Sequence, residues 1–150
     1  MSIDENKRLI LEHYESFVSK QDASAVREQL TQDFVDHEMP PGIPPGPEGA
    51  MQLRAMLHKA FPDFKIEIED IVAEGDRVAV RAHWTGTHCG PLPMLPIPPA
   101  NRKFAIGGMV FWRIREGKIA ERWAVLDRAA LMQQLAPQSQ PVGSAERVQA

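Results

Sequence analysis

Residues 60–81 read AFPDFKIEIEDIVAEGDRVAVR, and within this stretch the hydrophobic period changes from helical to strand-like. Pro62 ends a stripe of apolar residues at helical spacing. Apolar and charged residues then alternate from Phe64 to Glu69, the pattern of a strand with one buried face. Residues 74–76 read EGD and predict a turn into a second alternating run. The stretch therefore predicts a helix followed by a β-hairpin.

The same two periods divide the rest of the chain into a helical first part and a strand-rich second part. Apolar spacing predicts helices before the hairpin and strands after it, and residues 31–38 are expected to lead into a loop. This order of three helices followed by four strands is typical of an α+β fold. The expected helices cover residues 2–19, 23–30 and 47–61; the expected strands cover 64–69, 78–84, 104–114 and 119–126, and a short helix closes at 128–135.

Two proline-rich segments separate these elements. Residues 36–49 read DHEMPPGIPPGPEG and residues 86–102 read GTHCGPLPMLPIPPANR. Proline fixes φ and lowers the entropy lost on ordering, so these connections can form stiff walls at the mouth of a pocket. Asp36, His37 and His88 lie where the two segments begin, and histidine is the side chain that titrates nearest neutral pH. A small-molecule site is the first hypothesis.

Composition excludes several other classes of function. The net charge of −3 and the pI near 5.9 argue against binding to nucleic acid, which favours clustered Lys and Arg. Cys89 is the single cysteine, so neither a disulfide framework nor a zinc site is expected. Residues 1–10 have no apolar run of the length a secretory signal needs, and no segment approaches a membrane span. A cytoplasmic protein without a membrane partner is expected.

Four segments together resemble the SnoaL-like polyketide and ester cyclases of the nuclear-transport-factor-2-like superfamily. They are residues 36–49, 60–81, GTHCG at 86–90 and GKIAERWAVLDRAALMQQL at 117–135. The resemblance implies an α+β cone in which a curved antiparallel sheet packs against three N-terminal helices and encloses a pocket. It further implies a single domain over 1–135, no metal or cofactor, and a homodimer. Residues 136–150 are rich in Pro, Gln and Ser and are expected to form a flexible tail.

The resemblance also implies a chemistry, from which this chain departs. Members that close polyketide rings use a carboxylate on the last strand as general acid and base inside an apolar cavity. Ala124 stands where those cyclases carry the acid, and Val110 stands near the position of a supporting histidine. Neither side chain can transfer a proton. The cyclase mechanism therefore cannot be carried over unchanged.

Asp36, His37 and Arg122 are the candidate catalytic residues. Arg122 shares a strand face with Ala124 and could bind a carboxylate, a phenolate or an enolate, or else form a structural ion pair. Asp36 and His37 could provide acid and base, although an Asp beside a turn often caps backbone amides instead. Asp127 is expected to cap the last helix.

The candidate ligand-binding residues are aromatic, sulfur-containing or histidine side chains that suit a small apolar or aromatic ligand. The remaining histidines, His13, His58 and His83, are expected on solvated surfaces. The ligand-binding candidates are Tyr14, Phe17, Met39, Phe61, Trp84, His88, Met94 and Trp112.

Three functions remain open at this point. The first is a cofactor-independent enzyme of cyclase, isomerase, lyase or hydrolase type acting on a carbonyl compound. The second is a non-catalytic small-molecule binder, which Ala124 favours. The third is a dimerisation module that uses the outer face of the sheet.

Overall fold

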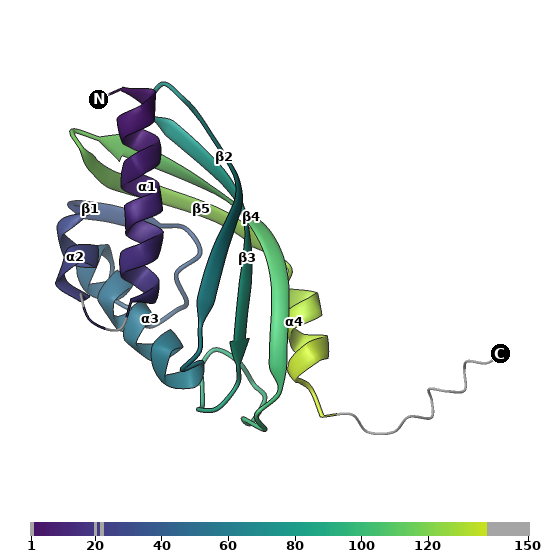
Figure 1. Ribbon diagram of the computed structural model, residues 1–150. Helices are drawn as coiled ribbons and strands as arrows, with labels where there is room; N and C mark the ends of the chain where they lie inside the picture. The colour runs from purple at the N-terminus through teal and green to yellow at the C-terminus, as the bar shows by residue number, and fades with distance from the viewer. Residues whose placement is uncertain (1, 20, 22, 138–150) are drawn as a thin grey trace.

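A computed structural model describes residues 2–19, 21 and 23–137 of the chain (Figure 1). The tail expected from residue 136 therefore lies outside the described residues except for its first two positions. The helices and strands are α1 (Ile3–Val18), α2 (Ala23–Glu28), β1 (Leu30–Asp36), α3 (Gly46–Ala60), β2 (Lys65–Glu74), β3 (Arg77–Thr87), β4 (Lys103–Arg115), β5 (Lys118–Leu126) and α4 (Arg128–Leu135).

The strands form one curled sheet in the order β1-β5-β4-β3-β2 (Figure 1). β2, β3, β4 and β5 pair antiparallel, as the alternating patterns predict. β1 pairs parallel with β5 at the sheet edge, so the prediction that residues 31–38 only lead into a loop was wrong. The second helix is correspondingly shorter than expected, because Leu30 already belongs to β1.

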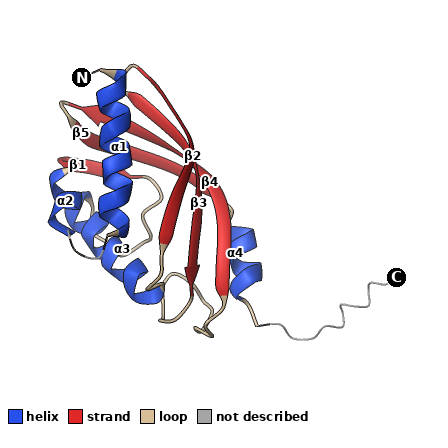
Figure 2. Ribbon diagram, in the orientation of Figure 1, coloured by secondary structure: helices blue, strands red, loops and turns tan. Residues whose placement is uncertain are grey.

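Helices α1, α2 and α3 cover one face of the sheet, which we call the inner face (Figure 2). The burial pattern of β3 shows how the strands supply the core: Val78, Val80, Ala82 and Trp84 are buried, and the residues between them are more exposed. The α+β fold with three N-terminal helices on a curved sheet is thus confirmed. The other, outer face of the sheet is left open by these three helices.

Local interactions fix the starts of α1 and α4 and the end of α3. Ser2 and Glu5 form a capping box at the start of α1, and Asp127 accepts a hydrogen bond from the Ala130 amide at the start of α4, as predicted. The second proline-rich segment is tied to the end of α3, since Cys89 and Gly90 both donate to the Ala60 carbonyl. A Cβ on Gly90 would lie 2.7 Å from the Lys59 carbonyl oxygen, so this close approach requires glycine.

A β-bulge in β5 decides which side chains reach the inner face. Ile119 pairs with Ile114 and Glu121 with Arg113, so Ala120 has no partner of its own on β4. The extra residue shifts the alternation, and the later positions Arg122 and Ala124 consequently face inward with Ile119. Without the bulge, Arg122 would point to the outer face.

Candidate functional site

Asp36, Arg122 and Trp112 lie side by side across three neighbouring strands of the inner face. Arg122 is the register partner of Asp36 on β1 and of Trp112 on β4. Its Nη1 lies 3.1 Å from Asp36 Oδ1, and its guanidinium carbon lies 5.5 Å from the centroid of the Trp112 ring. The arginine is thus held by a carboxylate on one side and an indole on the other.

This ion pair is shielded from solvent, but Asp36 does not use all the hydrogen-bond donors of Arg122. The side chain of Asp36 is 6% exposed and that of Arg122 is 17% exposed. Only Nη1 of the guanidinium bonds to Asp36, while Nε and Nη2 donate to no other described residue. A half-buried arginine with unused donors can bind a carbonyl or an oxyanion.

His37 lies on the opposite side of the sheet from the Asp36 carboxylate, because consecutive strand residues alternate between faces. Its Nε2 lies 2.7 Å from Glu121 Oε2, and its ring stacks on Trp123 with centroids 5.1 Å apart. The structure therefore separates two residues that the sequence suggested as an acid and base pair. Asp36 remains with Arg122, and His37 belongs to the outer face.

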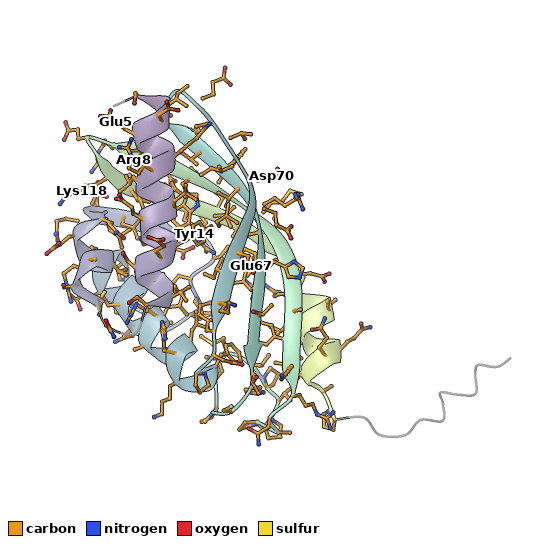
Figure 3. All side chains as sticks on the ribbon, in the orientation of Figure 1. Glu5, Arg8, Tyr14, Glu67, Asp70 and Lys118 are labelled. Carbon is orange, nitrogen blue, oxygen red and sulfur yellow. The ribbon has the colours of Figure 1, made fainter. Side chains whose placement is uncertain are left out.

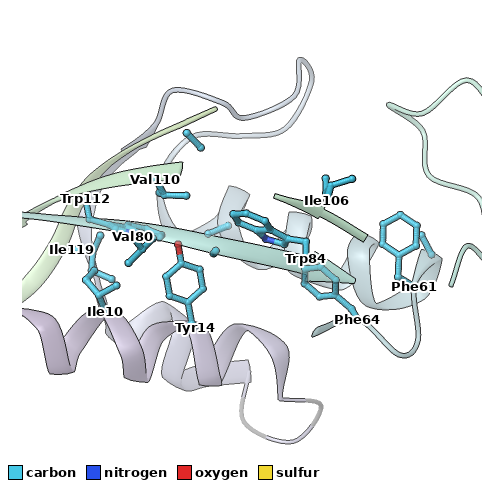
Figure 4. Packing of buried hydrophobic residues seen from close by; sticks show 14 of the residues in the cluster. Ile10, Tyr14, Phe61, Phe64, Val80, Trp84, Ile106, Val110, Trp112 and Ile119 are labelled. Atoms are coloured by element: carbon cyan, nitrogen blue, oxygen red, sulfur yellow. The ribbon is translucent and has the colours of Figure 1, made fainter. Parts of the chain in front are cut away.

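Helix α1 brings two consecutive residues against Trp112. The His13 ring lies 5.3 Å from the Trp112 ring and the Tyr14 ring 5.6 Å from it, both edge to face. Tyr14 extends from α1 toward the sheet (Figures 3 and 4). The inner site thus has one wall from α1 and one from β1, β5 and β4.

Two polar atoms in this wall are buried without a hydrogen bond of acceptable geometry to any described residue. They are the Tyr14 hydroxyl and the Trp112 indole nitrogen. Burial raises the pKa of Tyr14 to about 12, and the positive charge of Arg122 and the Trp112 indole act in the opposite direction. The hydroxyl therefore stays protonated at neutral pH. Buried polar groups that lack partners in the protein are available to a ligand.

His13 is a member of this site that the sequence did not indicate. It is 5% exposed, so the prediction of a solvated surface position was wrong, and His58 is likewise half-buried against the Phe17 carbonyl. Burial lowers the pKa of His13 to about 4, partly offset by a hydrogen bond to Gln29. His83 is exposed, as predicted.

The other predicted ligand-binding residues come from α1, the end of α3, β3 and the two proline-rich segments. Phe61 contacts His88 and Phe104, which stands eight residues from Trp112 at the far end of β4. His88 is fully buried there, and its burial lowers its pKa. Trp84 is buried, Met94 packs against the core, Met39 is half-buried in the first proline-rich segment and Phe17 contacts His13.

Ala124 and Val110 face each other on the inner surface of β5 and β4. They are register partners, and both are buried. Ala124 lies two residues beyond Arg122 on the same strand, so an acid at this position would have faced the interior. The Asp36 carboxylate, beside Arg122, stands on the neighbouring strand instead.

The outer face of the sheet carries two shallow hollows of about 920 and 620 Å³. Both are lined by Val72, Ala79, Phe111 and Trp123. Val72 is 62% exposed and Phe111 is 55% exposed, which is unusual for large apolar side chains. These exposed apolar side chains lie on the face that α1, α2 and α3 leave uncovered.

The described residues hold neither a metal-binding cluster nor a membrane-spanning helix. No group of three or more His, Cys, Asp or Glu in residues 2–19, 21 and 23–137 is arranged to hold a metal ion. Within the same residues, no helix has the length and hydrophobicity needed to cross a membrane.

Comparison with known proteins identifies close structural relatives. The family model of the SnoaL-like polyketide cyclases matches residues 8–135. IdmH, a candidate polyketide cyclase from Streptomyces antibioticus, is 32% identical over 87% of this chain and 97% of its own, with a TM-score of 0.73. AclR, a candidate hydroxylase from Streptomyces galilaeus, is 28% identical over 89% of this chain and 97% of its own, with a TM-score of 0.74.

A third structure extends the likeness in fold. TsrD from Streptomyces laurentii has a TM-score of 0.80 at 24% identity, over 90% of this chain and 97% of its own. No curated protein matches the chain.

Proposed function

The chain belongs to the SnoaL-like polyketide cyclase family, and on that premise we propose that it binds an aromatic carbonyl compound at the inner face, with the carbonyl oxygen on Arg122. The observation that carries the proposal is the Asp36–Arg122 pair, in which Asp36 occupies only Nη1 of the guanidinium. The guanidinium carbon lies 5.5 Å from the centroid of the Trp112 ring, and a flat ligand can pack against an aromatic ring.

The same geometry supports proton chemistry on an enolisable ligand. A carbonyl oxygen bound to arginine becomes more negative as the neighbouring C–H loses its proton, so Arg122 would stabilise the enolate more than the ketone. In this proposal the proton goes to the Asp36 carboxylate, which accepts hydrogen bonds from Arg122. It would take the role of the acid that Ala124 cannot perform.

A non-catalytic binder is the second candidate, and one specific observation favours it. Ala124 and Val110 are buried and inert where the polyketide cyclases were expected to carry their catalytic groups. In addition, both oxygens of the Asp36 carboxylate already accept hydrogen bonds from Arg122 Nη1. Binding without turnover would follow if Asp36 served only to orient the arginine.

One experiment separates the two candidates. The protein is mixed with 1-tetralone, an enolisable aromatic ketone, and binding is followed by tryptophan fluorescence while exchange of the α-hydrogens in D₂O is followed by NMR. Binding with accelerated exchange supports the enzyme, and binding without it supports the binder. Arg122→Met should weaken binding about tenfold or more, since it removes a charged hydrogen bond.

The exposed pair of Arg115 with Asp33 provides a matched control on the same sheet. Arg115 Nη2 lies 2.7 Å from Asp33 Oδ1, but both side chains are well exposed. Arg115→Met should therefore leave tetralone binding unchanged. Failure of the wild-type protein to bind any aromatic ketone would overturn the proposed function.

We also propose that two copies of the chain associate through the outer face. Met109, Phe111 and Val125 are 63%, 55% and 77% exposed there, and they extend the apolar surface of the two hollows. A second copy would bury these side chains, as in the apolar centre of a homodimer interface. This interface would lie on the opposite side of the sheet from the inner site.

A further inference from the structure

The end of β1 is held to the sheet by few backbone contacts. β1 lies at the sheet edge, so β5 is its one neighbour among the described strands (Figure 1). The pairing is irregular between Leu30 and Val35, and Asp36 opposite Arg122 is the last register pair. One further backbone bond follows, in which the His37 amide donates to the Arg122 carbonyl at 3.0 Å. A short pairing at an edge opens locally at low free energy, so the position of Asp36 depends on side-chain contacts near it.

His37 supplies two such contacts, both on the outer face. Its Nε2 lies 2.7 Å from Glu121 Oε2, and its ring stacks on Trp123 with centroids 5.1 Å apart and planes 8° from parallel. These two partners stand immediately before and after Arg122, and alternation along β5 turns both to the face opposite the Arg122 side chain. Two consecutive residues of β1 thus bind three consecutive residues of β5 from opposite faces, with Asp36 on the inner one.

The two partners of His37 are themselves tied to strands farther into the sheet. Arg113 of β4 donates from Nε to Glu121 Oε1 at 2.8 Å, which leaves Oε2 for His37. Hydrogen bonds from His37 and Arg113 lower the pKa of Glu121, so its carboxylate stays charged at neutral pH and accepts the hydrogen on the imidazole Nε2. On β3, the Arg77 guanidinium carbon lies 5.4 Å from the centroid of the Trp123 ring. His37 therefore joins the sheet edge to contacts that span three strands.

Asp36 is also restrained within its own turn, but that restraint does not cross to β5. The Glu38 amide nitrogen lies 2.9 Å from Asp36 Oδ1, a turn contact between residues two apart in the chain. This contact sets the direction of the carboxylate relative to β1 and not the distance from β1 to β5. Besides the one backbone bond, the contacts that set this distance beside Asp36 are its own bond to Arg122 and the outer-face contacts of His37.

We propose that His37 is a positioning residue for the inner site, because from the outer face it holds the end of β1 in the register that keeps Asp36 on Arg122. Its contacts with Glu121 and Trp123 supply the restraint. The inference rests on the proposed function, since the ion pair held in this way is the proposed ligand site. Without these contacts the edge strand moves more freely against β5, and Arg122 loses the partner that orients its unused donors.

A triple-mutant cycle without ligand tests this role. The coupling energy between Asp36 and Arg122 is measured by urea denaturation of Asp36→Asn, Arg122→Met and the double variant, once with His37 present and once in His37→Ala. The His37 side chain is 41% exposed, so its replacement leaves the core intact. We expect the coupling energy to fall to about half or less in His37→Ala. A merely structural His37 would lower the stability of all four proteins equally, and an unchanged coupling energy would overturn the inference.

Two conservative variants and one control separate the contacts of His37. His37→Gln keeps a donor for Glu121 and loses the ring, whereas His37→Phe keeps a ring against Trp123 and loses the donor. Each should retain part of the coupling energy that His37→Ala loses, and a loss in both as large as in His37→Ala would contradict the role of these contacts. His83 is the control, because it is exposed on the same face with Nδ1 3.8 Å from Glu69 Oε2. A coupling energy reduced in His83→Ala would overturn the inference, since the effect would not be specific to the end of β1.

Binding of 1-tetralone extends the test to the inner site. His37→Ala should bind the ketone about threefold or more weakly than the wild type, and His83→Ala should bind it as the wild type does. Equal affinities of His37→Ala and the wild type would overturn the inference and leave the proposed function intact. A wild-type protein that binds no aromatic ketone would overturn the proposed function, while the coupling energy measured without ligand still decides whether His37 positions Asp36.

Discussion

Asp36 and Arg122 are register partners in the parallel pairing of β1 with β5, and Arg122 Nη1 lies 3.1 and 3.2 Å from the two carboxylate oxygens. This is the only parallel pairing among the described strands. The ion pair therefore links the edge strand to the strand that carries the inner site. Its contribution to the stability of the fold can be measured by replacing either Asp36 or Arg122.

Removal of one partner of this pair should destabilise the fold more than removal of both. Arg122→Met leaves a buried carboxylate without its charge partner, and we expect a loss of about 3 kcal/mol in the free energy of unfolding. Asp36→Asn should cost a similar amount, while the double variant should recover most of the loss. Urea denaturation of the four proteins measures the coupling energy. Strictly additive losses would contradict a coupled pair, and the exposed Asp33–Arg115 pair should show little coupling by comparison.

The stability of the protein should rise with pH between about 4 and 6.5. His13 has its pKa lowered from 6.5 to about 4 in the folded protein, so in this range the unfolded chain binds a proton that the folded chain does not. Stability then increases with pH, by about 3 kcal/mol across the full range for this one group. Chemical denaturation at a series of pH values measures the slope.

His13→Phe provides the comparison for this pH dependence. The burial of His88 also lowers its pKa and contributes in the same direction, so the difference between wild type and variant isolates His13. The variant should have a shallower slope below pH 6.5. An identical slope would show that His13 is not buried in its neutral form.

The sequence predicted the strands that pair with a neighbour close by in the chain. β3 and β4 alternate over most of their length, and the turns that precede β3 and β5 carry Gly75 and Gly117, both with positive φ. β1 was missed because LTQDFVD does not alternate: Thr31 is buried beside Leu30, and the pairing register shifts before Val35. Its partner β5 lies about ninety residues away, and such a pairing leaves no local signal.

The candidate site was predictable only in part, for the same reason. Arg122 was placed on the inner face correctly, although the bulge at Ala120 that puts it there has no signature in the sequence. Asp36 and His37 were grouped because they are adjacent, and the missed strand explains why they separate. His13 could have been found, because it stands three residues after Ile10 and four before Phe17, on the apolar stripe of the first helix.

Gln134 should stabilise the part of β4 that extends beyond β5. The pairing of β4 with β5 ends at Gly108 and Leu126, and the Gln134 side chain then bonds both backbone groups of Ala105, at 2.7 Å from its amide nitrogen and 3.1 Å from its carbonyl oxygen. We expect Gln134→Ala to cost about 1 kcal/mol, since water can replace these exposed bonds in part. Hydrogen exchange at the Ala105 amide should become faster.

Gln134→Glu gives a matched control for this edge contact. The carboxylate can still accept from the Ala105 amide, but it cannot donate to the Ala105 carbonyl. Exchange at Ala105 should therefore remain slower in Gln134→Glu than in Gln134→Ala. Equal exchange rates in the three proteins would contradict a protective role for the glutamine.

A charged residue on the outer face should separate the proposed homodimer into monomers. Phe111 lies in both hollows of this face and is 55% exposed, so Phe111→Lys changes little in the core while placing a charge at the centre of the apolar surface. Leu11→Lys is the matched control, because Leu11 is 40% exposed on α1, in the helical layer that covers the inner face. Sedimentation velocity should show a dimer for the wild type and for Leu11→Lys, and a monomer for Phe111→Lys.

A monomeric wild type would exclude the dimer, and a dimeric Phe111→Lys would place the interface on another surface. Because the inner site uses residues of one chain only, the monomeric variant should still bind aromatic ketones.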